Sequence, residues 1–218
     1  MKLLSVVVPS TTNATTCDRL LTAYGRALHD AGLWELILVD DGSSDDTFAE
    51  LESVAASEPR VKVVRLRRNF GQSAATQAGL DAAAGDVIAT MDGDLQNDPA
   101  DIPLMVAKLD EGYDAVLGQR LNRQDKLLLR EASSSGARTG SSGKVLNVPF
   151  KDFGCAVRDA RRDVASGLML YGEMHRFITA LPRDSARRQG GPNAGAAPPP
   201  NRRAIEIQPD SHGAGSAR

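Results

Sequence analysis

The sequence is poor in cysteine, and its positive and negative charges nearly cancel. Its two cysteines, Cys17 and Cys155, exclude the disulfide framework of a small secreted domain, and neither has neighbours that suggest a metal cluster. The formal net charge of −2 gives no electrostatic reason to expect a nucleic-acid partner. The composition therefore favours a protein of a reducing cytoplasm that binds no nucleic acid.

Long hydrophobic runs are also missing. No run reaches the roughly 18–20 apolar residues that a membrane-spanning helix needs. The apolar start, MKLLSVVVPS, is too short for a signal peptide, and Pro9 leads into polar residues instead of a cleavage site. We expect a cytoplasmic chain that is soluble or at most peripheral on the inner face of the cell membrane.

What the sequence does contain, as far as Gly118, is an alternation of short apolar runs and helical patterns. Most of the runs are unbroken, which is typical of strands covered on both faces. The predicted strands are Leu4–Val8, Glu35–Val39, Val61–Leu66, Val87–Met91 and Ala115–Leu117. Repeated strand–helix units predict an α/β fold, with a mostly parallel Rossmann-like sheet and helices on both faces. Ligands of such sheets bind at the carboxyl ends of the strands.

Four helices are predicted between these strands. They are a helix that ends at Gly32, a helix that begins after Ser43–Ser44 with Asp45 and Asp46 in its first turn, and helices over Gln72–Ala84 and Ala100–Leu109. Such a set of elements, together with the length of the chain, predicts one main domain over residues 1–181.

Beyond Asp125 the periodic patterns weaken. Glu131–Gly143 is rich in serine and glycine and predicts a flexible loop. Order returns near residues 150–181, where apolar side chains are expected to cover one side of the sheet, namely Val157, Val164, Leu168 and Phe177. Residues 182–218 predict a largely disordered tail with a short edge strand at Ala204–Ile207.

An acidic turn follows the fourth predicted strand. Asp92 and Asp94 lie two residues apart, so in an extended chain both side chains point the same way. Gly93 between them lets a ligand approach the backbone closely. Two carboxylates suit a hard cation such as Mg²⁺ or Mn²⁺, which keeps open positions for phosphate oxygens. The alternative is that aspartate and glycine merely end a strand, because an Asp-x-Asp triplet alone is common.

A second acidic turn follows the second predicted strand. Asp41 and the residues Gly42–Ser44 after it make a good turn and helix cap, and this structural role is one interpretation of the segment. Asp40, at the end of the strand, is a candidate acceptor of hydrogen bonds from a nucleobase or a ribose. Both acidic turns are expected at the same edge of the sheet.

Four segments together resemble a known family. They are VVVPS, LVDDGSSDDT, RNFGQSAATQAGLDAAAGD and TMDGDLQNDP, and in this order they are similar to family 2 glycosyltransferases of the polyprenyl-phosphate type. That group includes dolichyl-phosphate mannose synthase and has a GT-A-type fold. The later segments EGYDAVLGQRLNRQD and DFGCAVRDARRDV resemble most the undecaprenyl-phosphate 4-deoxy-4-formamido-L-arabinose transferase branch.

The resemblance implies a role for individual residues. Asp40 would contact the base and ribose of the nucleotide. Asp92 would lie near the diphosphate and would hold the metal together with Asp94. Gln96 would line the sugar pocket, and Arg120 would lie near the phosphates. It also implies a nucleotide site that includes Pro9, Asp41, Gly71 and Gln72.

The implied reaction is inverting transfer of a sugar from a nucleotide-sugar, here a UDP-sugar, to a polyprenyl phosphate carrier. Mg²⁺ or Mn²⁺ would be the cofactor, and cell-envelope lipopolysaccharide synthesis would be the setting. A lipid phosphate is already an anion at neutral pH, so positioning and leaving-group stabilisation matter more than a general base. The sequence identifies neither the sugar nor the oligomeric state, and it is compatible with an oligomer.

The sequence also departs from the family. The Pro-x-Tyr-Asn-Glu segment has become Pro9-Ser-Thr-Thr-Asn13, the helix expected after Asp125 is replaced by the Ser/Gly loop, and the C-terminal membrane helices of many members are missing. These departures predict a truncated or rearranged chain with weak activity at most. They leave two alternatives open, a degenerate non-catalytic nucleotide-binding relative and a soluble glycosyltransferase with a different acceptor.

Overall fold

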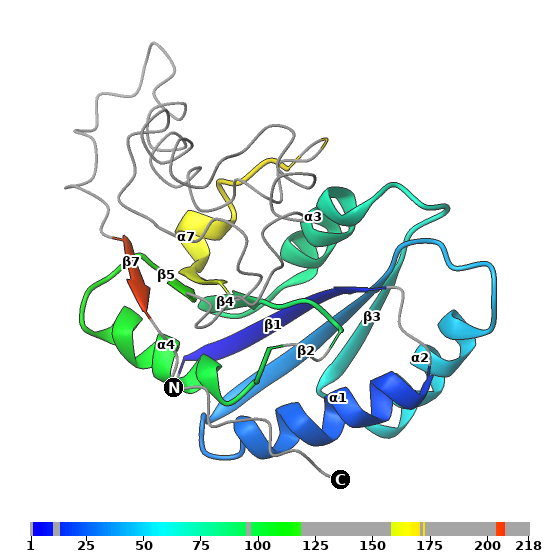
Figure 1. Ribbon diagram of the computed structural model, residues 1–218, viewed down its shortest axis with the longest axis horizontal. Coiled ribbons are helices and arrows are strands. Elements are labelled where there is room, and N and C mark those ends of the chain that lie inside the picture. Colours follow the sequence, from blue (N-terminus) through cyan, green and yellow to red (C-terminus); the bar gives the residue numbers. More distant parts are fainter. Residues whose placement is uncertain are drawn as a thin grey trace, which may run out of the picture.

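The computed structural model describes residues 2–10, 14–94, 97–118, 158–170, 172 and 204–207 (Figure 1). Seven strands form one sheet in the order β3-β2-β1-β4-β6-β5-β7. The strands are β1 (Leu3–Ser10), β2 (Leu33–Asp40), β3 (Val61–Arg65), β4 (Val87–Thr90), β5 (Ala115–Gly118), β6 (Arg158–Arg161) and β7 (Ala204–Ile207). The mixed α/β class expected from the sequence is confirmed.

Helices cover both faces of the sheet, as Figure 1 shows. They are α1 (Ala14–Ala27), α2 (Thr47–Ser57), α3 (Gln72–Ala82), α4 (Asp101–Asp110) and the short α7 (Arg162–Ala165). On one face, side chains of α1, α2 and α4 pack against alternate residues of β1 and β2. On the other face, side chains of α3 and of α7 with the segment after it pack against the residues in between. This two-sided burial explains the unbroken apolar runs of the central strands.

The strand connections place a topological switch point between β1 and β4. β1 pairs in parallel with both β2 and β4, while β2 pairs in parallel with β3. The chain therefore adds β2 and then β3 on one side of β1, and it places β4 on the other side of β1. Ligands of open α/β sheets bind outside the carboxyl ends of the strands at such a switch point.

The sequence analysis missed one strand of the sheet. β6 has the sequence RDAR, lies between β4 and β5, and pairs antiparallel with both. Four mostly charged residues carry no apolar signal, so only the pairing with two neighbours identifies the strand. After it, Val164 and Leu168 are buried as expected, and the predicted edge strand over Ala204–Ile207 exists and pairs with β5. The other two apolar residues expected to cover the sheet, Val157 and Phe177, lie outside the described residues.

The predicted start of the second helix is wrong. α2 begins at Thr47, and its N-cap is Asp46, which makes no side-chain capping hydrogen bond. Ser43–Ser44 does not cap the helix, because the neighbouring carboxylates hold this loop in another conformation. Asp40 accepts a hydrogen bond from the backbone N–H of Ser43, and Asp41 bonds to the loop after β3.

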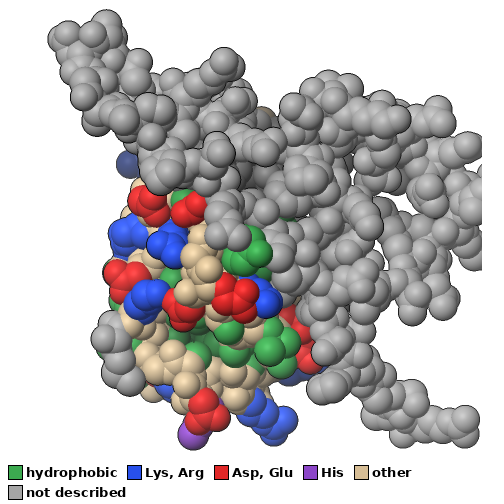
Figure 2. All heavy atoms as spheres, turned by 90° about the vertical axis from the view of Figure 1, so that its left-hand side faces the viewer, with side chains coloured by type: hydrophobic (Ala, Val, Ile, Leu, Met, Phe, Trp, Pro, Cys, Tyr) green, Lys and Arg blue, Asp and Glu red, His purple; other side chains and the backbone are tan. Residues whose placement is uncertain are grey.

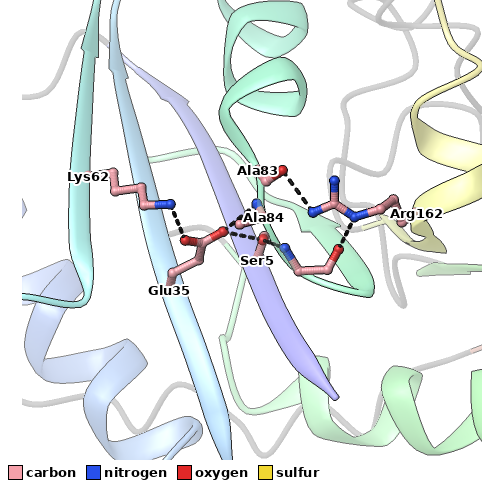
Figure 3. A network of polar contacts seen from close by, with 7 residues as sticks. Ser5, Glu35, Lys62, Ala83, Ala84 and Arg162 are labelled. Atoms are coloured by element: carbon pink, nitrogen blue, oxygen red, sulfur yellow. Dashed lines mark hydrogen bonds and ion pairs between the residues drawn. The ribbon is translucent and has the colours of Figure 1, made fainter. Parts of the chain in front are cut away.

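A polar network ties the amino ends of the central strands together (Figure 3). One carboxylate oxygen of Glu35 on β2 accepts hydrogen bonds from the Ser5 hydroxyl (2.5 Å) and from the N–H of Ala84 (2.7 Å). The other oxygen forms an ion pair with Lys62 on β3 at 2.6 Å. Arg162 donates to the carbonyl oxygens of Ala83 and Gly85 from the other side. The turn between α3 and β4 is thereby held from both directions.

The outer surface around α4 carries charges of both signs. Figure 2 shows acidic and basic side chains interspersed over the described part of this face. Lys2 pairs with Asp110, and Lys108 pairs with Glu111 at 2.7 Å. Across the described parts of the chain, no helix is long and apolar enough to cross a membrane. The proposed division at residue 181 and the flexible loop over Glu131–Gly143 concern regions that are mostly outside the described residues and stay predictions.

Candidate functional site

Three loops meet at the carboxyl edge of the parallel strands. They follow β2, β3 and β4, and the first and the last are the two acidic turns predicted at this edge. Pro9, singled out in the sequence, lies near the end of β1 and is paired with Val39 in the register of the sheet. Gln96 and Arg120 lie outside the described residues.

Asp40 is the last residue of β2 and is completely buried. Its Oδ1 accepts a hydrogen bond of 3.0 Å from the N–H of Ser43. Its Oδ2 has no hydrogen-bond partner among the described residues, although the Nε of Arg65 lies 3.6 Å away in an ion pair. That distance is too long for a hydrogen bond. A buried carboxylate oxygen without a donor is costly, so this atom is suited to accept a hydrogen bond from a ligand.

Arg65 lies beside Asp40 and was not among the residues singled out in the sequence. It is the last residue of β3, pairs with Asp40 in register, and stacks its guanidinium over the ring of Phe48 at 4.3 Å. The stacking on an aromatic face holds the arginine in place beside the buried carboxylate. Its position at a strand end, the criterion that marked Asp40, could have identified it.

Asp41 has its two oxygens bonded to the backbone of the loop after β3. Oδ1 accepts from the N–H of Phe70 and Oδ2 from the N–H of Gly71, both at 2.8 Å. Gly42 beside it has a φ of +73°, and a Cβ there would lie 2.3 Å from the carbonyl carbon of Arg68. The loops after β2 and β3 are therefore in direct backbone contact, which only glycine permits at this position.

Asp92 follows β4, after the buried Met91. The side-chain amide of Gln72, the first residue of α3, donates a hydrogen bond of 2.8 Å to Asp92 Oδ1. Asp92 is half-buried, Gly93 is buried, and Asp94 is exposed at the surface of the turn. The structure thus brings Asp41, Gly71, Gln72 and Asp92 together through direct contacts, while Asp94 lies two residues farther along the same turn.

The chemistry of these donors fits a hard divalent cation. Carboxylate oxygens are its preferred protein ligands, and Mg²⁺ commonly takes only one or two of them, with water and phosphate oxygens completing its coordination. Among the described residues no group of three or more His, Cys, Asp or Glu could hold a metal ion. Asp92 and Asp94 are the two carboxylates of this turn that could hold such a cation.

Two buried polar groups lie beneath this edge and were not predicted. The phenol of Tyr24 on α1 is completely buried, and burial, with added effects of the charges on Asp92 and Asp159, raises its pKa. Asp159 on β6 is also completely buried, and burial raises the pKa of its carboxyl group well above the ordinary value. Neither the Tyr24 hydroxyl nor the Asp159 carboxyl has a hydrogen-bond partner among the described residues.

Known proteins with similar sequences share most of this chain. It is 44% identical over 180 residues to a dodecaprenyl-phosphate galacturonate synthase of Rhizobium johnstonii, covering 81% of this chain and 53% of the relative. It is 39% identical over 192 residues to an undecaprenyl-phosphate 4-deoxy-4-formamido-L-arabinose transferase of Klebsiella pneumoniae, covering 86% of this chain and 58% of the relative. The chain therefore spans little more than half the length of these relatives.

Solved structures share the fold. Glucosyl-3-phosphoglycerate synthase from Mycobacterium tuberculosis, in complex with Mn²⁺, UDP-glucose and phosphoglyceric acid, superposes with a TM-score of 0.64 at 21% identity, over 95% of this chain and 69% of that one. A mannosyltransferase from Pyrobaculum calidifontis in complex with GDP-mannose and Mn²⁺ gives a TM-score of 0.60 at 18% identity, over 95% of this chain and 55% of that one. These likenesses confirm the expected GT-A-type fold.

The model of one protein family, glycosyl transferase family 2, matches residues 5–164. The match begins in β1 and ends in α7, and so it contains all three loops at the carboxyl edge. Because it covers well over half of the sequence, and because the 44% and 39% identical relatives are polyprenyl-phosphate sugar transferases as the motifs implied, this chain belongs to glycosyl transferase family 2.

Proposed function

We propose that this protein is an inverting glycosyltransferase that moves a sugar from a UDP-sugar to a polyprenyl phosphate. The observation that carries the proposal is the position of Asp40, Asp92 and Asp94 at the carboxyl edge of the sheet, beside the switch point between β1 and β4. The names of the two sequence relatives, which both specify a polyprenyl-phosphate product or acceptor, support the choice of acceptor.

The donor nucleotide would bind along the loops after β2 and β3. The buried Oδ2 of Asp40 would be the acceptor for an N–H of the base or an O–H of the ribose, and Arg65 forms an ion pair beside it. Pro9 on the neighbouring strand would form the wall of the same pocket. A hydrogen bond to a charged acceptor contributes about 1.5–3 kcal/mol.

The diphosphate would lie against the turn after β4. Asp94 and Asp92 would hold Mg²⁺ or Mn²⁺ there, and the bound cation would supply neutralisation of the charge that develops on the departing UDP. Gly93 lets the diphosphate approach the backbone of the turn. Gln96 and Arg120 are proposed, from the family motifs alone, to line the sugar pocket and to contact the phosphates.

The acceptor phosphate would attack the anomeric carbon from the side opposite the leaving UDP. The bond between that carbon and the UDP oxygen breaks as the new carbon–oxygen bond forms, and the configuration inverts in this single displacement. A lipid phosphate needs no deprotonation at neutral pH, so no aspartate here has to act as an obligatory base. Binding a lipid carrier would place the protein at the periphery of the cytoplasmic membrane surface.

The test is turnover of UDP-sugars with and without a polyprenyl phosphate. The donors would carry the two sugars named in the sequence relatives, galacturonate and 4-deoxy-4-formamido-L-arabinose. Metal-dependent transfer to the lipid supports the proposal. Turnover that is indifferent to the lipid would point to another acceptor, and nucleotide binding without turnover would point to a degenerate relative.

A further inference from the structure

We infer that Asp41 and Gln72 act together as a positioning relay for Asp92, rather than as contacts to the nucleotide. The inference rests on the proposed function, because it assigns Asp92 to the diphosphate and metal site. The relay consists of three links, from Asp41 to the backbone at Gly71, along one residue to Gln72, and from the Gln72 amide to Asp92.

The first link fixes where α3 begins. The carboxylate of Asp41 accepts two backbone hydrogen bonds of 2.8 Å, from Phe70 and Gly71. Gly71 is the N-cap of α3, has a φ of +91°, and accepts hydrogen bonds on its carbonyl oxygen from the N–H groups of Ala74 and Ala75. Two charge-assisted bonds to consecutive N–H groups leave the first turn of the helix little freedom.

The second link reaches from α3 to a distant loop. Gln72 directly follows the clamped residue, and its amide donates to Asp92 Oδ1 at 2.8 Å. In the sheet, β2 and β1 lie between β3, which precedes Gln72, and β4, which precedes Asp92. The helix crosses these two strands and contacts both, so Gln72 connects turns that are not neighbours in the sheet.

The residue types suit a relay. An ionised carboxylate only accepts hydrogen bonds, so the group facing Asp92 must be a donor, and the amide of glutamine supplies one without adding charge. Glutamate at the same place would repel Asp92, and asparagine would be one methylene too short. Asp41 bonds with both carboxylate oxygens to the backbone, so its carboxylate holds the loop after β3 in place.

The expected consequence is on metal binding. Hydrogen bonds that orient a ligating carboxylate typically change metal affinity 10–100-fold when they are removed. Gln72→Met keeps the length and volume of the side chain and removes the donor. We therefore expect about a 10-fold weaker affinity of the Gln72→Met protein for Mn²⁺ in the presence of UDP.

The same helix offers a matched control. Gln77 also donates from its side-chain amide to an aspartate, Asp81, at 2.8 Å, and it accepts a hydrogen bond from the N–H of Leu170 as well. Gln77→Met removes the same group from α3 at a position five residues farther along the helix, where the partners are Asp81 and Leu170. It should leave Mn²⁺ affinity unchanged even if it lowers stability, so a general disturbance of α3 is distinguished from a specific effect at Asp92.

The experiment is calorimetric titration of Mn²⁺ with UDP into the full chain, together with the electron paramagnetic resonance spectrum of bound Mn²⁺. Three results together would support the relay. Wild type binds Mn²⁺ in the presence of UDP, Gln72→Met binds Mn²⁺ more weakly and with an altered spectrum, and Gln77→Met has the affinity and spectrum of wild type. Equal affinities and spectra in Gln72→Met and wild type would overturn the relay alone. Wild-type protein that binds UDP identically with and without Mn²⁺ would overturn the metal site and, with it, the relay.

A double-mutant cycle tests the first link. Asp41→Asn should also weaken Mn²⁺ binding, although the Asp41 carboxylate itself bonds to the loop after β3. If Asp41 acts through Gln72, the double variant should be no weaker than the more affected single variant. Additive losses would overturn the relay. Should Asp41→Asn lose its cooperative thermal transition, Gln72→Asn replaces it as a test of the second link, because it keeps the amide but shortens its reach to Asp92. Wild-type affinity in Gln72→Asn would overturn the relay.

Discussion

Asp40 and Asp159 are both completely buried, yet their surroundings differ. Asp40 accepts a backbone hydrogen bond and lies beside the guanidinium of Arg65, with one oxygen left to accept from a ligand. Asp159 lies on β6 beside Ala89 and Val116 in the register of the sheet. Both of these residues are buried in the hydrophobic core that α1, α2 and α4 cover. Asp40 therefore has a hydrogen-bond donor and a nearby guanidinium, whereas the Asp159 carboxyl group has no hydrogen-bond partner among the described residues.

The account of Asp40 predicts a loss of nucleotide affinity in Asp40→Asn. Asparagine keeps an oxygen for the N–H of Ser43, but it places an amide where the ligand's donor should bind and removes the partner of Arg65. Affinity for UDP should fall about 10-fold or more, the equivalent of one charge-assisted hydrogen bond. Calorimetry measures it. Asp81→Asn on α3 is the control, and an Asp40→Asn protein with wild-type affinity would remove Asp40 from the site.

The account of Asp159 predicts that Asp159→Ala stabilises the protein at neutral pH. A raised pKa in the folded state means that the unfolded chain loses this proton near pH 4 while the folded chain retains it. The cost of Asp159 is therefore small below pH 4 and grows as the pH rises towards the folded-state pKa. The gain in unfolding free energy should reach roughly 1–3 kcal/mol at pH 7.

Urea denaturation of Asp159→Ala and wild type at pH 4.5 and pH 7 checks this expectation. Asp159→Asn is the matched variant, because it keeps the size and polarity of the side chain but cannot ionise. It should remove the pH dependence without the full gain in stability. An Asp159→Ala protein that is less stable than wild type at pH 7 would show that the carboxyl group has a stabilising partner.

At the scale of elements, the central strands were predictable and the lateral ones were less so. β1 and β2 are buried on both faces, and that burial requires the apolar runs that identify them in the sequence. β6 has no such run, because its RDAR sequence joins the sheet by backbone pairing on both sides, and its Arg161 donates to the backbone carbonyl oxygens of Leu109 and Tyr113. The start of α2 was missed because Asp40 and Asp41 bond to backbone groups that a sequence pattern does not reveal.

The network at the amino ends of the strands carries an element-scale prediction. Burial opposes the ionisation of Glu35, but hydrogen bonds from Lys62, Ser5 and Ala84 outweigh it and lower its pKa. A lowered folded-state pKa contributes stability above the unfolded value of about 4.3, and this contribution is lost as the pH falls. Glu35→Gln should therefore lower the unfolding free energy by about 1–2 kcal/mol at pH 7 and by less at pH 3.5.

Denaturant unfolding of Glu35→Gln at both pH values tests the network. Glu52→Gln, on the exposed face of α2, is the control and should change stability little. The trend with pH is opposite to that of Asp159→Ala, whose effect grows as the pH rises. A Glu35→Gln effect that is equal at pH 7 and pH 3.5 would show that the charge of Glu35 does not hold the turn between α3 and β4.

At the scale of the whole molecule, the described residues hold the proposed donor half of a glycosyltransferase site. The sheet order places Asp40, Asp92 and Asp94 at one edge, and sequence motifs alone located them because parallel strands end on the same side. The contacts among them were not predictable, since the bond of Gln72 to Asp92 joins residues 20 positions apart in sequence. Gln96 and Arg120, which would complete the site, stay predictions.

The central claim is that this edge binds a nucleotide diphosphate together with a divalent cation, and Asp94 tests it most directly. Asp94 is exposed in its turn, so Asp94→Ala should leave the fold intact while removing a ligand of the cation. The measurement is calorimetric titration of UDP into wild type and Asp94→Ala, each with and without Mn²⁺. We predict that Mn²⁺ strengthens UDP binding to wild type and has no effect on Asp94→Ala. Equal strengthening by Mn²⁺ in both proteins would contradict the account.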